Sequence, residues 1–407
     1  MMTRSMPATG IQHSTPSAEG WAGIRSRYPA ASRSTFLNIT SGTPLSKAAK
    51  AAVDALLEAQ LGGDLGAEQR TPLMQSARAR FAEVIGAQAA EIAITKNVTE
   101  GLNIVAHAMD WQAGDNVVVC TELEHPNNVY LWLALRNRGV EVRMPRAQNG
   151  AIDTDAMIAA IDARTRIVTV ASVTFAPGFR TELEKLGRAC RKAGVLFLVD
   201  GVQSCGILEM DVDAMHIDAL ATSTSKGLIG IAGLGFLYVR AAWIERLTPV
   251  YIGRYSIERG TGHESELEAN EFGLVSDARR FEAGNYNWAG IAAAQASMAE
   301  LLETGISAIE SRAVALASAL AEGLQMAELP VTQPPPGIER SHIVTVGRLG
   351  AGDTKTTGDA KLDRISSALQ EGGVKFTLRK GLLRFGFHYY NDESDVARVL
   401  EIVRGAK

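Results

Sequence analysis

The chain has 407 residues, of which 46% are hydrophobic and 21% are charged, and it carries a formal net charge of −4 with a pI near 6.0. This balance is typical of a folded protein with more than one domain, and it favours neither a nucleic acid nor a membrane as a partner. The three cysteines, Cys120, Cys190 and Cys205, are too few and too irregularly spaced for a zinc site or a disulfide framework, so we expect a cytoplasmic protein without a metal centre.

The start of the chain, Met1 to about Gly20, is rich in serine, threonine, proline and glycine and has no apolar core. This composition indicates a loose tail rather than a signal peptide. Further along, the window Ala219–Val239 is apolar enough to span a membrane by length. Because Lys226 and several hydroxyl groups lie inside that window, we predict a strand, a loop and a strand instead.

Six short hydrophobic runs predict buried strands, because they are continuously apolar rather than alternating in polarity. Helical patterns separate most of these runs, and this alternation predicts an α/β fold with a mostly parallel central sheet and helices on both faces. The predicted strands are Glu91–Thr95, Asn116–Cys120, Arg166–Ser172, Val195–Val199, Ile217–Ala221 and Leu234–Val239. The predicted helices between them are Val98–His107, Pro126–Arg138, Asp153–Ile161 and Glu182–Lys192.

The pattern changes after about Asn285. Two long helical segments precede two loops, a further helix, two short strands and a final helix, which predicts a smaller α+β domain. These segments are Trp288–Glu303, Ala308–Glu322, Gln333–Gly337, Gly350–Asp359, Lys361–Gln370, Lys375–Arg384 and Ser394–Arg404. We therefore expect a flexible N-terminal tail and lead-in over residues 1–35, a large domain over 36–284 that would bind the cofactor inferred below, and a small C-terminal domain over 285–407.

Two chemically distinctive side chains follow predicted buried strands. Asp200 comes directly after Val195–Val199, and Lys226 follows Ile217–Ala221. A carboxylate and an amine at neighbouring strand ends can face each other across the crevice in which open α/β sheets bind ligands. Pyridoxal phosphate chemistry needs such a pair, because a lysine forms the Schiff base and an acid keeps the ring nitrogen protonated. The pair therefore predicts a pyridoxal-phosphate enzyme.

The segment from Asn97 to Glu100 joins a predicted strand to a predicted helix and resembles a capping box with Asn97 as the cap. The amides of Val98 and Thr99, with the Thr99 hydroxyl, would then form an anion site at the helix N-terminus. The alternative is an ordinary, well-capped helix N-terminus that binds no anion. The segment alone does not decide between these readings.

Three other polar residues also end or follow strands. An imidazole at His125 could lie flat on a pyridine ring, although a single histidine at a strand end is more often structural. Ser223 and Ser225 supply hydroxyls for a phosphate, although they could equally belong to an ordinary loop. Asp200 alone could be the metal-binding acid of a phosphate-hydrolysing motor, but that class needs a G-x-x-x-x-G-K-[ST] loop and the chain has no Gly-Lys dipeptide.

Seven motifs in family order resemble the class V aminotransferase family of fold-type-I pyridoxal-phosphate enzymes. Within that family the chain is similar to the branch of cysteine desulfurases, selenocysteine lyases and isopenicillin N epimerases. The resemblance covers about Phe36 to Val403. The motifs are Phe36–Leu45, Asn97–Asn103, Glu124–Asn128, Val199–Gln203, Ser223–Lys226, Arg280–Gly284 and Leu383–Asn391.

This resemblance implies a role for each motif residue. Lys226 would form the Schiff base with pyridoxal 5'-phosphate, His125 would stack on its ring and Asp200 would pair with the ring nitrogen. Gln203 would reach the phenolic oxygen, and Arg384 would bind a substrate α-carboxylate, for which a bidentate guanidinium is suited. The phosphate would be held by Val98, Thr99, Ser223 and Ser225, and Asn38 is expected to contact the substrate.

Four departures from the family pattern bear on the reaction. The desulfurases use a cysteine on a loop of the C-terminal domain, but no cysteine follows Cys205, which argues against persulfide-forming desulfuration. Ser225 stands where the family usually has a histidine, and Phe175 where relatives often have an asparagine. Asn285 replaces a threonine that reaches the phosphate of the partner subunit, and we still expect a homodimer with a shared site.

The sequence therefore predicts a pyridoxal-phosphate enzyme that acts on an α-amino acid, a small-molecule substrate, through a Schiff base. Elimination of a β-substituent, as in a carbon–sulfur lyase, is slightly preferred, and transamination and epimerisation are the alternatives. A nucleotide-dependent α/β enzyme is disfavoured because Gly230–Gly235 does not have the G-x-G-x-x-G spacing. An inactive binding protein is disfavoured by the intact Lys226, Asp200 and Arg384.

Overall fold

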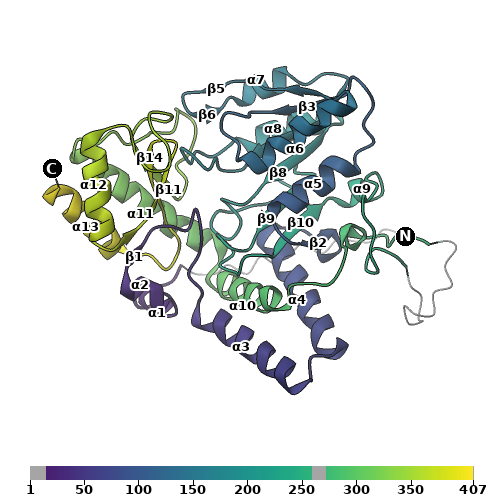
Figure 1. The fold of residues 1–407 in the computed structure, drawn as a ribbon, viewed down its shortest axis with the longest axis horizontal. Helices are drawn as coiled ribbons and strands as arrows, with labels where there is room; N and C mark the ends of the chain where they lie inside the picture. The colour runs from purple at the N-terminus through teal and green to yellow at the C-terminus, as the bar shows by residue number, and fades with distance from the viewer. Residues whose placement is uncertain (1–14, 259–271, 407) are drawn as a thin grey trace.

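A seven-stranded sheet forms the centre of the molecule. The computed structural model describes residues 15–258 and 272–406. Across the sheet, the strands lie side by side in the order β2-β10-β9-β8-β7-β3-β4 (Figure 1). All neighbouring strands are parallel except β10, which is antiparallel to β2 and β9. This arrangement confirms the predicted α/β fold. The strands are β2 (Ile92–Thr95), β3 (Asn116–Val119), β4 (Glu141–Arg143), β7 (Thr165–Ala171), β8 (Leu196–Asp200), β9 (Ala219–Ser223) and β10 (Gly235–Val239).

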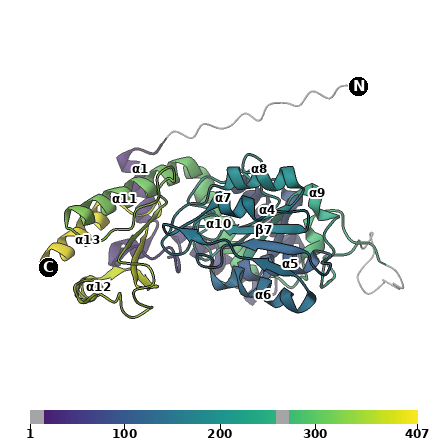
Figure 2. The same ribbon diagram turned by 90° about the horizontal axis from the view of Figure 1, so that it is seen from above.

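Helices cover both faces of this sheet, and the strands are hydrophobic on both sides for that reason. In β8, Leu196 and Leu198 enter one core while Phe197 and Val199 enter the core on the other face. Figure 2 shows α7 and α8 on one side of the sheet and α5 and α6 on the other. The covering helices are α4 (Ala67–Ile85), α5 (Val98–Ala108), α6 (Tyr130–Leu135), α7 (Thr154–Ala159), α8 (Leu183–Ala193), α9 (Ala241–Ile244) and α10 (Trp288–Thr304).

The C-terminal part has its own antiparallel sheet, in the order β11-β14-β13, and a third hydrophobic core (Figure 1). Strands β13 and β14 are joined by only Lys380 and Gly381, whose φ angles of 48° and 80° are those of a tight hairpin turn. The elements are α11 (Ile306–Met326), β11 (Ile343–Val346), α12 (Ala360–Glu371), β12 (Val374–Lys375), β13 (Thr377–Arg379), β14 (Leu382–Gly386) and α13 (Glu393–Gly405). The division of the chain at residues 284 and 285 remains a proposal.

The lead-in, which the sequence predicted to be flexible, contains two helices, α1 (Ala18–Ser26) and α2 (Pro29–Arg33). Arg25 forms an ion pair of 2.7 Å with the buried Asp395, and the Tyr28 hydroxyl lies 2.6 Å from that of Tyr389. These contacts hold the helices against the C-terminal part. Sequence reasoning missed them because the anchoring residues are scattered among small and polar ones.

Other differences between prediction and structure are local. Helix α3 (Lys47–Gly62) and helix α4 were not predicted, and α10 packs against both. The predicted helix Pro126–Arg138 is wrong as a single element. Val129 has non-helical φ and ψ and separates a 3₁₀ turn at Pro126–Asn128 from α6, and a second 3₁₀ turn at Arg136–Arg138 follows α6. Short strands also pair as β1 (Thr35–Phe36) with β12 and as β5 (Ala147–Gln148) with β6 (Ala151–Ile152).

The apolar window at 219–239 forms β9, a loop and β10, as predicted. Over residues 15–258 and 272–406, none of the helices combines the length and the hydrophobicity that crossing a membrane would require.

A buried ion pair joins α4 to the segment that leads into α10. The Glu282 carboxylate lies 2.7 Å from the Arg78 guanidinium, accepts the Ile94 amide at 2.7 Å and also accepts the Tyr286 hydroxyl. Both ion-pair partners are almost inaccessible to solvent, with 8% of the Arg78 side chain and none of the Glu282 side chain exposed. Because every acceptor position of Glu282 is used, the carboxylate fixes β2 against these two segments.

We expect Glu282→Gln to lower the free energy of unfolding by about 3–5 kcal/mol, because the buried Arg78 charge then has no counter-charge. Glu303→Gln is the control, since Glu303 is 69% exposed in its pair with Arg27 and should contribute no more than about 1 kcal/mol. Urea unfolding followed by circular dichroism measures both. Equal effects of the two substitutions would contradict the role assigned to Glu282.

Candidate functional site

The N-terminus of α5 lies beside the end of β9. Asn97 caps the helix, because its side-chain oxygen accepts the Glu100 amide at 2.9 Å, as the sequence predicted. The Val98 amide donates to the Ser223 hydroxyl oxygen at 2.9 Å, and Thr99 follows in the first turn. The helix end therefore presents amides and hydroxyls together, which is the arrangement that binds a phosphate.

A glycine allows α5 to lie this close to the sheet. A Cβ atom added at Gly101 would come within 2.8 Å of the Ala221 side chain in β9. The first turn of α5 thus rests directly on the strand that leads to Ser223 and Lys226. Any larger residue at this position would push the helix end away from the site.

Asp200 and Lys226 lie in one buried pocket. Asp200 ends β8, and its Oδ1 accepts the Val202 amide at 2.9 Å. Burial raises the pKa of Asp200, and the charge of Lys226 opposes this shift. Burial lowers the pKa of Lys226 from 10.5 to about 8, against the attraction of Asp200. The amine is therefore much closer to its neutral, nucleophilic form at physiological pH than an exposed lysine.

His125 lies at the same edge of the sheet. Its Nδ1 accepts the Asn127 amide at 3.3 Å, which leaves the proton of the neutral ring on Nε2. Its ring meets the Phe175 ring edge-on, with 5.4 Å between centroids. Burial, and then the charges of Lys226 and Arg384, lower the pKa of His125. The imidazole is therefore neutral near pH 7 and can face an aromatic ring without a charge penalty.

Five of the predicted residues, Val98, His125, Asp200, Gln203 and Lys226, line one small cavity of about 50 Å³, whereas Thr99, Ser223, Ser225 and Arg384 do not. Gln203 lies in its wall and donates from Nε2 to the Thr40 carbonyl at 3.1 Å. Ser223 lies next to the cavity through its bond to Val98, and Ser225 directly precedes Lys226. The lining residues are Val98, His125, Asn127, Ala171, Val173, Phe175, Asp200, Val202, Gln203 and Lys226.

Arg384 is a buried cation, only 2% exposed. Its guanidinium donates to three neutral acceptors, the Thr377 hydroxyl at 3.0 Å, the Phe175 carbonyl at 2.5 Å and the Ser41 hydroxyl at 2.9 Å. Within residues 15–258 and 272–406 it forms no ion pair with a carboxylate. Burial, and then the charge of Arg379, lower its pKa to about 9. A buried guanidinium without an acid can pair with an anionic group, so the predicted contact of Arg384 with a substrate carboxylate stays a prediction.

Asn38 and Asn285 occupy different places. Asn38 forms a β-bridge with Gly386, two residues from Arg384, and in the described part of the chain its buried side-chain oxygen has no hydrogen-bond partner. Asn285 lies in a separate cavity with Lys96. The substrate contact of Asn38 stays a prediction, as does the phosphate contact of Asn285 across a dimer.

Sequence reasoning missed His388, which contacts the backbone of Gly227, the residue after Lys226. His388 is fully buried, its Nδ1 accepts the Tyr389 amide at 2.8 Å, and its Nε2 lies 2.9 Å from the Gly227 carbonyl. Because Nδ1 is an acceptor, Nε2 carries the proton and donates to Gly227. His388 belongs to the motif Leu383–Asn391, but only the fold reveals its contact to the residue after Lys226.

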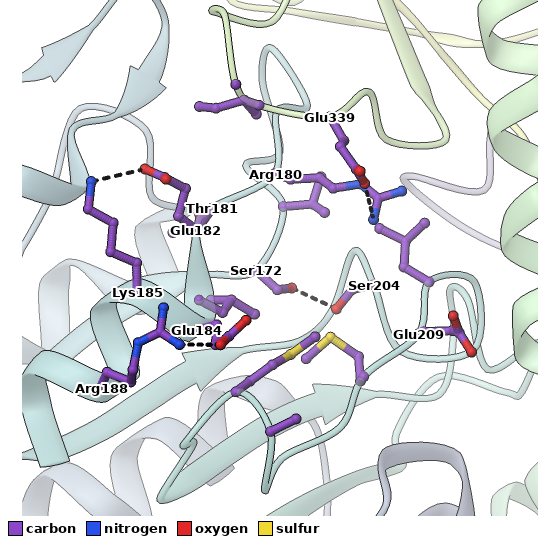
Figure 3. Close-up of a pocket in the computed structure, with 18 residues that line it drawn as sticks. Ser172, Arg180, Thr181, Glu182, Glu184, Lys185, Arg188, Ser204, Glu209 and Glu339 are labelled. Atoms are coloured by element: carbon purple, nitrogen blue, oxygen red, sulfur yellow. Dashed lines mark hydrogen bonds and ion pairs between the residues drawn. The ribbon is translucent and has the colours of Figure 1, made fainter. Parts of the chain in front are cut away.

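A larger cavity, of about 510 Å³, lies elsewhere, between the start of α8 and the C-terminal part (Figure 3). Its only amine is that of Lys185, which is ion-paired with Asp155 at 2.8 Å. Figure 3 shows further pairs, between Arg188 and Glu184 and between Arg180 and a carboxylate across the cavity. The three cations that line this cavity, Arg180, Lys185 and Arg188, are each paired with a carboxylate, and none of the residues predicted to hold the cofactor lines it.

The family comparison agrees with this assignment. A model of the family "Aminotransferase class-V" matches residues 62–399. The chain belongs to this family. Membership confirms the resemblance predicted from the seven motifs, and with it an enzyme that depends on pyridoxal 5'-phosphate.

Curated class V relatives carry sulfur-related names. A probable cysteine desulfurase of Methanothermobacter thermautotrophicus is 36% identical over 253 residues, which are 61% of this chain and 61% of the relative. A probable cysteine desulfurase of Pyrococcus abyssi is 29% identical over 83% of this chain and 84% of its own length. A cysteine desulfurase of Yersinia pestis is 29% identical over 82% of each chain.

Solved structures share the fold. The apo cysteine desulfurase of Thermococcus onnurineus superposes with a TM-score of 0.81 at 24% identity, over 97% of this chain and 100% of that one. A variant of C-DES with glycine covalently linked to its PLP cofactor gives 0.81 at 22% identity, over 93% and 98%. At this identity the likeness establishes the fold, which is the predicted fold type I.

The residues at the small cavity fit the cofactor. Lys226 offers an amine of lowered pKa, and Asp200 offers a buried carboxyl group within its electrostatic reach. The end of α5 and the Ser223 hydroxyl offer donors for a phosphate, while His125 offers a flat neutral ring. Each chemical part of pyridoxal phosphate thus has a matching group on this chain.

We expect carbamylation of Lys226 in the apoprotein by cyanate to increase with pH up to a midpoint near 8, because only the neutral amine reacts. A lysine peptide in the same solution should keep its ordinary midpoint, near 10.5. Asp200→Asn should move the Lys226 midpoint down, since the carboxylate stabilises the ammonium form. Peptide mass spectrometry of Lys226 measures all three, and a wild-type midpoint near 10 would contradict the proposed environment.

Proposed function

We propose that this chain cleaves a carbon–sulfur bond of an α-amino acid by β-elimination. The observation that carries the preference for this reaction is the placement of the cysteines. Cys120, Cys190 and Cys205 are buried, and none of them lines the cavity at Lys226. Burial raises the pKa of Cys120 to about 11 and that of Cys205 to about 12, so neither thiol is poised to attack sulfur.

Two groups would bind and orient the substrate. Arg384 would hold the α-carboxylate, because its buried charge is matched by no acid of the described chain. The buried oxygen of Asn38, near the same strand, would accept a hydrogen bond from the substrate. Fixing the carboxylate sets which bond at the α-carbon faces the cofactor, and this choice decides the reaction.

Bound pyridoxal phosphate supplies an electron sink for the electron pair left at the substrate α-carbon. Asp200 would keep a proton on the ring nitrogen, and its burial makes this electrostatic contribution large. Once substrate has displaced it, the Lys226 amine, with a pKa near 8, would carry the α-proton at Nζ. A cysteine derivative and one water would then give pyruvate, ammonium and the thiol that leaves the β-carbon.

A cysteine desulfurase is the second candidate, because relatives bear that name. That reaction would convert cysteine to alanine and leave sulfur on a protein thiol. Transamination and epimerisation remain alternatives within the family. β-Elimination, desulfuration, transamination and epimerisation would all use the same residues to bind the cofactor and the substrate carboxylate. Only analysis of the products can therefore distinguish the four reactions.

We also propose a homodimer in which Asn285 contacts the phosphate site of the partner. Large apolar side chains are exposed near its cavity, including Val250 at 57% and Ile252 at 46%. Tyr251, between them, interacts with Glu100, which lines the cavity of Asn285. An apolar patch of this kind is typical of a protein interface.

We expect Lys226→Ala to fold normally and to lose turnover by at least about 10³-fold, because no other amine of the cavity can accept the α-proton. Lys185→Ala is the matched control. This lysine lines the larger cavity, pairs with Asp155, and its loss should leave turnover within about twofold. Release of pyruvate or keto acid from a panel of amino acids provides the measurement. Wild-type-like turnover in Lys226→Ala would refute the assignment.

We expect a variant with Cys120, Cys190 and Cys205 all replaced by alanine to retain elimination, with pyruvate and ammonia formed in equal amounts from cysteine or a thioether derivative. Circular dichroism checks that the variant folds, because each thiol fills part of a core. Alanine as the product in the wild type, together with loss of activity in this variant, would establish the desulfurase instead. Amine transfer that depends on an added keto acid would establish an aminotransferase.

A further inference from the structure

A second arginine lies on the same face of the small sheet as Arg384. In the hairpin, Thr377 pairs with Arg384 and Arg379 pairs with Leu382. Residues directly opposite each other share a face, and so do residues two apart on one strand, so Arg379 and Arg384 are diagonal neighbours. The bond of 3.0 Å from Arg384 to the Thr377 hydroxyl confirms which face this is.

The turn of the hairpin adds a third positive charge. The Lys380 amine lies 5.1 Å from the centroid of the Phe175 ring and donates to the Glu122 carbonyl at 2.8 Å. Phe175 in turn meets His125 and accepts the Arg384 guanidinium. The hairpin therefore brings Lys380 and Arg384 against Phe175, which lines the Lys226 cavity.

The nearby acid compensates Lys380 only in part. The Glu122 carboxylate attracts Lys380, but it forms its ion pair with Arg146 at 2.6 Å and also accepts the Ala147 amide at 3.0 Å. Arg379 donates from its guanidinium to the Leu378 carbonyl at 2.8 Å, and over residues 15–258 and 272–406 it takes part in no ion pair. Its charge reaches the site, since it contributes to lowering the pKa of His125, Lys226 and Arg384.

We propose that Arg379 binds a second acidic group, at the far end of the substrate side chain. This inference rests on the proposed function, in which Arg384 holds the α-carboxylate. One carboxylate leaves the charge of Arg379 unmatched, and diagonal neighbours in an antiparallel pair stand about 7–8 Å apart. The substrate class is therefore an amino acid whose β-substituent ends in a carboxylate or another oxyanion a few atoms beyond the β-carbon.

The first experiment measures binding without turnover. Isothermal titration of the holoenzyme with glutarate and with butyrate compares a dicarboxylate with a monocarboxylate of similar size. We expect glutarate to bind at least about tenfold more tightly, which is the effect of one further charge-assisted pair. Arg379→Gln should remove this advantage and leave butyrate within about twofold, whereas Arg384→Gln should weaken both. Arg398→Gln, on α13 and 45% exposed, is the control and should change neither.

Equal binding of the two acids by the wild type, or an unchanged preference in Arg379→Gln, would overturn the proposal. Because the wild-type comparison needs no substitution, a variant that fails to fold does not remove the test. Arg379→Lys provides a further check, because it keeps the charge without the planar fork and should retain part of the preference.

The second experiment separates this inference from the proposed function. S-carboxymethylcysteine and S-ethylcysteine differ in the acidic group at the end of the β-substituent. We expect kcat/KM for pyruvate release to be at least about tenfold higher for S-carboxymethylcysteine. Arg379→Gln should lower kcat/KM for this compound and leave kcat/KM for S-ethylcysteine unchanged. Pyruvate from both compounds without a preference would refute the role of Arg379 and leave the lyase intact. A preference in binding without pyruvate from either would refute the lyase and leave the anion site intact.

Discussion

The site depends on an amine and a carboxyl group that line one cavity at the end of the sheet and interact electrostatically. Burial draws Lys226 and Asp200 toward their neutral forms, while each favours the charged form of the other. This balance gives a nucleophilic amine at ordinary pH, and it survives only if water is excluded and the two groups stay in place. The close packing of α5 on β9 at Gly101 and the hydrogen bond from His388 to the Gly227 carbonyl help to hold the two groups in position.

The second constraint is the placement of positive charge around that pair. Burying a guanidinium without an acid costs several kcal/mol in effective desolvation, and at Arg384 only neutral oxygens offset this cost. A group that is held in position before the ligand arrives loses little entropy on binding, so part of the cost returns as affinity and orientation. Arg379 adds a second positive charge on the same face of the hairpin, two residues along β13 from the partner of Arg384.

The sequence predicts the parts of the molecule that are specified locally. The strands β2, β3 and β7 to β10 are continuous apolar runs, and Asp200 and Lys226 follow such runs. Features that depend on distant partners could not be read in this way. His388 and Gly227 are 161 positions apart. Arg379 lies on the same face as Arg384 only because of the register in which β13 pairs with β14. Helix α4 also escaped prediction, because its charged residues and internal Pro72 obscure the helical period.

The contact between Tyr28 and Tyr389 links the lead-in to the residues that pack around His388. Tyr389 is covalently next to His388, whose ring is held by the Tyr389 amide and in turn holds the Gly227 carbonyl. A chain shortened to begin after α2 would lose Tyr28 and leave a cavity beside Tyr389 and Tyr390, whose rings pack on His388. A segment whose composition suggests a removable leader is thus part of the packing around His388, and truncation for crystallisation is expected to loosen that packing while every predicted cofactor residue stays in the chain.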